Sequence, residues 1–128
     1  MNLASIIDGH DGASIALIED GRRVSYAELR ERVAAMRAHF GSMGLGLGDH
    51  VAVACGNEIH FVVATLGALG AGCVVAPINP YSPINELKRK VAPLDARCIV
   101  IGAVARDMLD HADEFDAPLI DMKTVADS

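Results

Sequence analysis

Tryptophan is absent from this sequence of 128 residues, and aromatic side chains are scarce, with two Tyr and three Phe. A folded core must therefore be aliphatic, which is the usual filling of a parallel β-sheet covered by helices. A hydrophobic fraction of 52% and a mean hydropathy of +0.31 argue against a disordered chain. The length is enough for one domain, or one substantial subdomain, with a buried core.

An excess of basic residues is also lacking, because 11 Lys and Arg stand against 17 Asp and Glu, for a formal net charge of -6. The chain has no basic field that could hold a nucleic acid backbone, so we expect no nucleic acid partner. The basic run 88–90 would spread over roughly 200 degrees of a helix and cannot form one tight patch. We interpret it as the exposed side of an amphipathic helix, and attraction for the phosphates of a nucleotide is the alternative.

No Cys-x-x-Cys pair occurs, and Cys55, Cys73 and Cys98 are widely spaced within apolar runs. We predict that they are reduced, buried, small hydrophobic residues, which disfavours zinc or redox chemistry and leads us to expect a cytoplasmic location. No Lys or Arg precedes Arg22, and Asp8 interrupts the first apolar residues, so we predict no signal peptide.

Three motifs of common catalytic and phosphate-binding sites are missing: GxxxxGKS/T, GxSxG and HExxH. Gly44-x-Gly46-x-Gly48 is similar to a dinucleotide-binding turn, but such a turn must follow a strand and open a helix. Here the glycines follow a predicted helix and precede a predicted strand, so we interpret them as a connector. The five histidines show no ligand spacing, and we assign no catalytic residue and no metal ligand.

One run of 18 residues without charge, 61–78, is long enough for a membrane-spanning helix. Its helical pattern ends at Gly70-Ala71-Gly72, however, and residues 73–76 restart as a β-rich segment that Pro77 and Pro80 close. We therefore predict a buried helix followed by a buried strand, and no transmembrane segment.

The clearest local signals lie in the first third of the chain. Asp20-Gly21, between two apolar segments, predicts a β-hairpin over 15–24. Ser25-x-x-Glu28 predicts a capping box, in which the Ser25 hydroxyl accepts from the Glu28 N–H and the Glu28 carboxylate reaches back to the Ser25 N–H. A helix is expected from there, with Gly41 and Gly44 as its stop and with an apolar face made by Leu29, Val33, Met36, Phe40 and Met43.

Signals for strands and helices then alternate. They predict an α/β fold, a layered, mostly parallel sheet flanked by helices, with the β-hairpin at its N-terminal side. Asn57 is expected to cap one helix, Ser82 to cap the next with Pro83 in its first turn, and the wholly apolar segment 73–78 to form a central strand. The expected order is strand 50–55, helix 58–70, strand 73–78, a helix from Ser82 that ends before Pro93, strand 97–101, a short helix to about His111 and strand 118–122.

Two segments in this order resemble core motifs of one family. Val24–Leu29 (Val-Ser-Tyr-Ala-Glu-Leu) resembles the first core motif of adenylate-forming enzymes, the superfamily of acyl-CoA synthetases, peptide-synthetase adenylation domains and luciferases. Leu69–Pro80 resembles the second, and its ending in Pro-Ile-Asn-Pro is similar to acyl-CoA synthetases in particular. The resemblance covers roughly residues 12–102 and identifies 1–128 as a single N-terminal subdomain of such an enzyme.

This resemblance implies a reaction in two steps, in which a carboxylate attacks the α-phosphorus of ATP and the CoA thiol then displaces AMP. ATP, Mg and CoA are implied for the full-length protein and none is assigned to this segment, because the family's phosphate loop, magnesium carboxylate and catalytic lysine lie after the region seen here. In relatives the loop after the second motif approaches the CoA channel. By that matching, Asn79, Pro80 and Tyr81 are candidates for proximity to CoA, and Arg106 is a candidate for contact with its nucleotide phosphate.

The leading hypothesis is the N-terminal scaffold portion of an acyl-CoA synthetase that activates a carboxylic acid, in particular a fatty acid, and that is inactive by itself. The alternative is a free-standing, non-catalytic α/β binding or interaction module. The expected partners are a small-molecule carboxylic acid and CoA, through the full-length enzyme. An isolated segment would leave an apolar face or a sheet edge uncovered, so we expect it to form a homo-oligomer.

Overall fold

The fold follows the alternation of strands and helices that the sequence predicts. The computed structural model describes residues 3–19, 21–56 and 58–126. The elements in chain order are the 3-10 helix η1 (Leu3–Ile7), β1 (Ile15–Glu19), β2 (Arg22–Ser25), α1 (Tyr26–Ser42), β3 (His50–Ala54), α2 (Ile59–Gly70), β4 (Val74–Pro77), α3 (Ile84–Val91), the 3-10 helix η2 (Ala92–Leu94), β5 (Cys98–Ile101), the 3-10 helix η3 (Ala103–Glu114), β6 (Leu119–Asp121) and α4 (Met122–Ala126).

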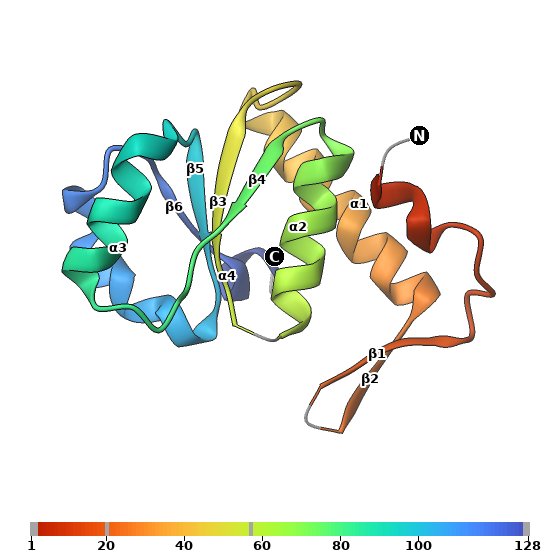
Figure 1. Cartoon of the computed structure of the whole chain (residues 1–128). Coiled ribbons are helices and arrows are strands. Elements are labelled where there is room, and N and C mark those ends of the chain that lie inside the picture. Colours follow the sequence, from red (N-terminus) through yellow and green to blue (C-terminus); the bar gives the residue numbers. More distant parts are fainter. Residues whose placement is uncertain (1–2, 20, 57, 127–128) are drawn as a thin grey trace.

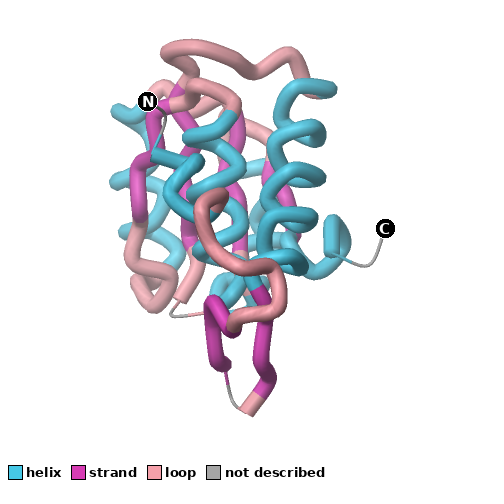
Figure 2. Tube along the Cα trace, turned by 90° about the vertical axis from the view of Figure 1, so that its right-hand side faces the viewer, coloured by secondary structure: helices cyan, strands magenta, loops and turns pink. Residues whose placement is uncertain are grey.

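Four parallel strands form the main sheet, in the order β4-β3-β5-β6. From β3 the chain passes to β4 on one side, then crosses over to β5 on the other side of β3. Helices α1 and α2 cover one face of the sheet, and α3 and η3 cover the other (Figure 1). The hairpin β1–β2 is an antiparallel sheet of its own, set apart from the parallel strands (Figure 2). The predicted α/β fold class is confirmed.

Alternate side chains of the central strands belong to two separate cores. Val51 and Val53 of β3 pack with α1 and α2, whereas Ala52 and Ala54 pack with α3 and η3. Strand β5 alternates in the same way, and all four of its residues are buried. A strand that is buried on both faces reads as a continuous apolar run, which is why the sequence marks these two strands clearly.

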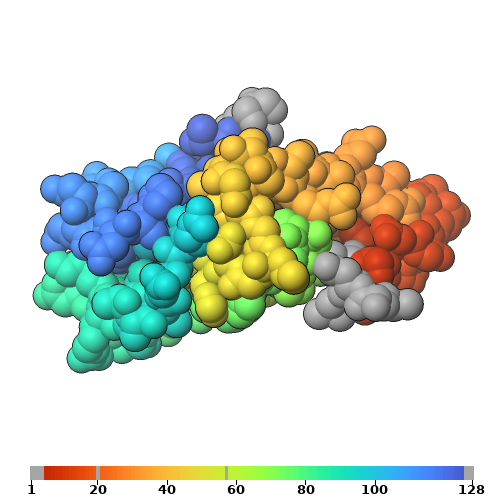
Figure 3. Space-filling model, turned by 90° about the horizontal axis from the view of Figure 1, so that it is seen from above, coloured from red at the N-terminus to blue at the C-terminus, as the bar shows by residue number. Residues whose placement is uncertain are grey.

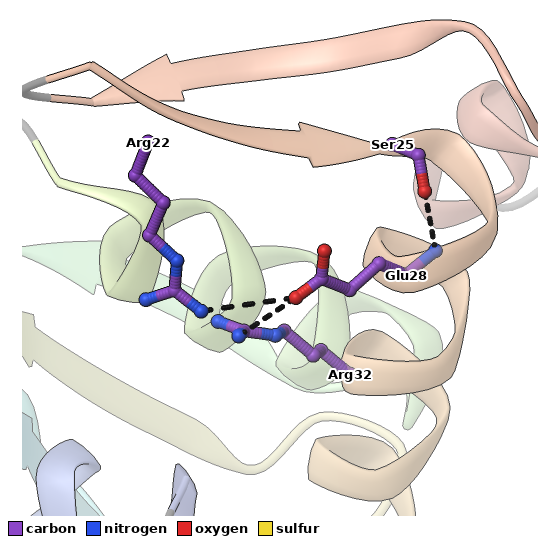
Figure 4. A network of polar contacts seen from close by, with 4 residues as sticks. All are labelled: Arg22, Ser25, Glu28 and Arg32. Atoms are coloured by element: carbon purple, nitrogen blue, oxygen red, sulfur yellow. Dashed lines mark hydrogen bonds and ion pairs between the residues drawn. The ribbon is translucent and has the colours of Figure 1, made fainter.

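Helix α1 begins at the cap residue that the sequence predicts. The Ser25 Oγ accepts from the Glu28 N–H at 3.2 Å. The second half of the predicted capping box is wrong, because the Glu28 carboxylate contacts two arginines in place of the Ser25 N–H (Figure 4). Its Oε1 lies 2.9 Å from Nη2 of Arg32 and 3.7 Å from Nη2 of Arg22. A charged donor forms the stronger hydrogen bond with a carboxylate, so the guanidinium groups outcompete the backbone.

Segment 73–78 does not form the central strand that its apolar composition predicts, because β4 lies at the edge of the sheet. Val74 is 46% exposed. The Val74 N–H donates to the carbonyl of Asp49, just before β3, and the Ile78 N–H donates to the carbonyl of Val53 in β3. Pro77 lies an odd number of positions from each, so its backbone faces outward and offers no N–H to a further strand. The apolar composition indicates that other elements pack on the segment. The crossover that places β5 on the far side of β3 makes β3, and not β4, a central strand.

Helix α3 begins one residue later than predicted, with Pro83 and not Ser82 at the cap position. The carbonyl of Pro83 accepts from the Glu86 N–H at 2.9 Å, and no side chain caps this helix. The Ser82 N–H donates to the carbonyl of Asn79, so Ser82 belongs to the preceding turn. Pro83 itself has an extended backbone, with φ of -58° and ψ of 152°, so the helical geometry begins only at Ile84. The other predicted cap, Asn57, lies outside the described residues.

The loop Gly44-x-Gly46-x-Gly48 connects α1 to β3, as predicted. Gly44 and Gly48 have φ of 81° and 85°, a conformation that glycine adopts without strain. Seen from above, the loop lies across the middle of the molecule, between the N-terminal residues at one end and the segments after residue 80 at the other (Figure 3). The loop follows a helix and leads into a strand, so it lacks the strand-to-helix context of a dinucleotide-binding turn.

The basic run 88–90 lies on the outer side of α3, as predicted. Lys88 pairs with Glu114 at 2.8 Å and Lys90 with Glu86 at 3.2 Å, while the opposite side of the helix is buried. Within residues 3–19, 21–56 and 58–126, no helix is long and apolar enough to cross a bilayer.

Helices α1 and α2 approach each other closely at Gly67. A Cβ at this position would lie 2.8 Å from the Cβ of Met36 and 3.3 Å from the backbone nitrogen of Arg37. We expect Gly67→Ala to lower the free energy of unfolding by about 1–3 kcal/mol, because the two helices must move apart, and urea denaturation measures this change. Gly41→Ala is the matched control, since a Cβ there meets nothing within 4 Å and should raise stability by up to about 1 kcal/mol. A Gly67→Ala chain as stable as the wild type would contradict the close approach.

Candidate functional site

The loops that follow three parallel strands meet at one edge of the sheet and surround a hollow of about 600 Å³, here called the carboxyl-edge hollow. Gly56 follows β3, Tyr81 follows β4, and Ala103 and Val104 follow β5. In Figure 1 this edge of the sheet points down, toward the hairpin. The start of α2 and the end of β1 complete the lining with Glu58, His60, Ile18 and Glu19.

The carboxyl-edge hollow lies where two chain connections diverge. Strand β3 continues toward α2 on one face of the sheet, and its neighbour β5 continues into η3 on the other face. When the connections from two adjacent parallel strands run to opposite faces of the sheet, a crevice remains between the carboxyl ends of the strands. Open α/β sheets bind ligands in this crevice, which makes the hollow the candidate site.

Glu58 lies in this crevice, with its side chain only 14% exposed. Its Oε1 accepts from the Ala103 N–H at 3.3 Å and lies 3.5 Å from Nδ1 of His60. A Cβ on Gly102 would be 2.1 Å from this oxygen, so the carboxylate occupies space that only a glycine leaves free. Glu58 thereby connects the start of α2 to the start of η3.

Glu19 contributes a second carboxylate from the hairpin. Its Oε1 accepts from the Ile59 N–H at 2.8 Å, while Glu58, at the cap position of α2, makes no side-chain cap bond to its own helix. Each of the two helix N-termini at the crevice is therefore bound by a carboxylate, which neutralises part of its positive dipole end. A phosphate that entered the hollow would meet two negative charges.

The predicted turn at residues 79–81 reaches the hollow through Tyr81. The Asn79 Oδ1 accepts from the Tyr81 N–H at 2.9 Å and so fixes the turn. Tyr81 is 72% exposed, and its hydroxyl oxygen would lie 3.3 Å from a Cβ on Gly56. Asn79 and Pro80 support this turn but do not line the hollow.

Arg106 lies on η3, at the same edge of the sheet but outside the lining of the hollow. Its Nη2 is 3.2 Å from Oδ2 of Asp121, a carboxylate at the end of β6 that is only 10% exposed. Arg106 therefore does not line the hollow with Tyr81, and it pairs with an acidic partner. A phosphate bound there would have to share the guanidinium with Asp121.

Thiol chemistry is disfavoured at this site. Burial, with a smaller contribution from the Glu58 charge, raises the pKa of Cys55 to about 12, and burial raises the pKa of Cys98 to about 12 as well. A nucleophilic cysteine needs a lowered pKa. Among the described residues, no group of three or more His, Cys, Asp or Glu is placed to hold a metal ion.

Glu19, Glu58 and Gly102 were not predicted from the sequence as site residues. Glu58 carries a weak signal, because it is a charged residue between the predicted strand 50–55 and an apolar helix, where the carboxyl edge of a parallel sheet is expected. Glu19 carries none, since its contact with Ile59 spans 40 residues and depends on where the hairpin lies.

Comparisons with known proteins define the class to which this fold and site belong. The N-terminal subdomain of NpsA from Klebsiella oxytoca, solved in complex with 3-hydroxyanthranilyl-AMSN, matches with a TM-score of 0.80 and 22% identity, over 99% of this chain and 31% of that one. The fold is thus that of the N-terminal domains of adenylate-forming enzymes.

Sequence comparison finds CoA ligases among the relatives of this chain. The 4-coumarate–CoA ligase-like 9 of Oryza sativa subsp. japonica is 30% identical over 112 residues, which cover 84% of this chain and 20% of the relative. A long-chain-fatty-acid–CoA ligase of Yersinia pestis is 32% identical over 106 residues, which cover 77% of this chain and 19% of the relative. The chain thus spans about a fifth of the length of these relatives.

The profile of the family described as AMP-binding enzyme matches residues 8–127. This chain therefore belongs to the AMP-binding enzyme family, and it corresponds to the N-terminal region of the adenylate-forming acyl-CoA ligases within it.

The raised pKa values lead to a test of the cysteines. Cys55 and Cys98 stay protonated well above neutral pH, and burial raises the pKa of Cys73 in the same direction. Because the thiolate is the reactive form, we expect the native chain to react very slowly with a disulfide reagent such as DTNB at about pH 8. Unfolding in guanidinium chloride should release all three thiols. Rapid labelling of the native chain would contradict this burial.

Proposed function

We propose that this chain is the N-terminal scaffold portion of a cytoplasmic acyl-CoA ligase that activates a carboxylic acid with ATP to an acyl-adenylate and transfers the acyl group to CoA. The observation that carries the proposal is the family match over residues 8–127, together with CoA ligases among the relatives. A fatty acid is the proposed substrate class, since ligases named for medium- and long-chain fatty acids are among them.

The carboxyl edge of the sheet is the part of this chain that we assign to CoA. Tyr81 presents an exposed ring and hydroxyl at the rim of the hollow. The carboxylates of Glu19 and Glu58 disfavour phosphates inside the hollow, so we assign the nucleotide phosphate of CoA to the η3 side, near Arg106. ATP and magnesium are assigned to the part of the ligase beyond this segment.

The isolated chain is expected to catalyse no ATP–pyrophosphate exchange with any acid, because we assign the family's Ser/Thr/Gly-rich phosphate loop, which ends in Lys, to the part of the ligase beyond this segment, and its relatives are about five times longer. The assay uses the purified 128-residue chain with a panel of fatty and aromatic acids, and a ligase that contains the chain serves as the positive control. Exchange above background by the isolated chain would contradict the assignment of ATP to the remainder.

The coding frame distinguishes this proposal from a free-standing binding module. A Ser/Thr/Gly-rich loop that ends in Lys, encoded within the next ~100 residues after Ser128, supports the ligase. A stop codon at that position supports the module.

We also propose that the isolated chain self-associates through the apolar surface beside β4. Leu47 is 93% and Val74 is 46% exposed, and Gly72, two residues before Val74, lies against Leu47. Exposed apolar side chains on an edge strand favour association. Light scattering should detect dimers or larger species, and Val74→Lys should shift the population toward monomer. A wild-type chain that is monomeric at high concentration would contradict this proposal.

A further inference from the structure

Glu58 occupies an unusual position for a residue that begins a helix. Its backbone lies at the cap position of α2, yet its carboxylate turns away from that helix and accepts from the Ala103 N–H of η3. The N-terminus of α2 is served by Glu19 from the hairpin, at 2.8 Å from the Ile59 N–H. Because Glu19 takes over the capping of α2, the Glu58 carboxylate is available to cross the crevice.

Gly102 is shaped to receive this carboxylate. Its φ of -96° is open to any residue, so backbone conformation gives no reason for a glycine. The reason is space, because a Cβ would lie 2.1 Å from Oε1 and 2.9 Å from Cδ of Glu58. Two residues 44 positions apart in the chain are therefore matched to each other at the switch point of the sheet.

The contact holds one end of the first turn of η3. A 3-10 helix has about three residues per turn, so Arg106 lies one turn after Ala103. The two ends of this turn are held by two carboxylates, Glu58 at the Ala103 N–H and Asp121 at the Arg106 guanidinium. The turn thereby keeps a defined place between the hollow and β6, with Ala103 and Val104 in the lining.

We propose that Glu58 is a positioning residue for CoA: by binding the Ala103 N–H against Gly102, it sets the place of the 102–106 turn, which carries Arg106. This inference rests on the proposed function, in which the carboxyl edge of the sheet faces CoA. Glu58 acts through the turn and touches no reacting atom. Its loss should therefore weaken the use of CoA and leave the formation of the acyl-adenylate unchanged.

The test measures the two half-reactions separately in the ligase that contains this chain. Glu58→Ala should raise the KM for CoA about tenfold, because hydrogen bonds to charged groups are worth at least that factor, with little change in ATP–pyrophosphate exchange. Glu58→Gln keeps an oxygen acceptor and should stay within about threefold of the wild type. Glu31→Ala, which removes an exposed carboxylate from α1, is the matched control and should change neither half-reaction.

A second variant covers the case in which Glu58→Ala does not fold. Gly102→Ala keeps the carboxylate but displaces it, and should raise the KM for CoA in the same way. In the 128-residue chain, the NMR resonance of the Ala103 amide should shift in Glu58→Ala and Gly102→Ala and stay in place in Glu31→Ala.

The outcomes separate this inference from the proposed function. A wild-type ligase that forms no acyl-CoA would overturn the proposed function, while the Ala103 amide would still report the contact. An unchanged KM for CoA in both Glu58→Ala and Gly102→Ala, in a ligase that does form acyl-CoA, would overturn the positioning role. Equal losses in both half-reactions would also count against it, because they indicate general damage to the fold.

Discussion

The parallel pairing of β3 with β5 is the interaction on which the rest of the structure depends. Residues 51–54 pair with residues 98–101, and all eight side chains have no exposed surface. Each strand supplies alternate side chains to the two cores on opposite faces of the sheet. A shift of one residue in this register would exchange the two sets of side chains, and the packing of both helical layers would be lost.

The same pairing creates the candidate site. Because β3 and β5 are parallel neighbours, their carboxyl ends lie side by side, and because their connections leave to opposite faces, the space between those ends stays open. Glu58 and Gly102 meet there because Glu58 lies in the loop after β3 and Gly102 directly follows β5. The hairpin adds Glu19 from a third direction, so the polar lining of the hollow is assembled from three separate parts of the chain.

Local sequence patterns correctly predicted the elements that are fixed by interactions between residues close together in the chain. The hairpin over 15–24 and the start of α1 at Ser25 follow from turn and cap residues a few positions apart. Two predictions at helix starts failed because neighbouring residues compete for the same role. Glu28 was expected to bind the Ser25 N–H and instead pairs with Arg32 and Arg22, and Pro83, with an extended backbone, takes the cap position that was expected for Ser82.

The sequence by itself determined the α/β class, the family and the order of the elements from the hairpin to β6, because periodicity, capping and the motifs of Val24–Leu29 and Leu69–Pro80 are properties of short segments. Tertiary structure alone decided that β4 is an edge strand, and that Glu58 and Gly102 share one crevice. The physical reason is that strand order is chosen by how crossovers pack helices on the two faces of the sheet. A contact between residues 44 positions apart exists only after that choice has been made.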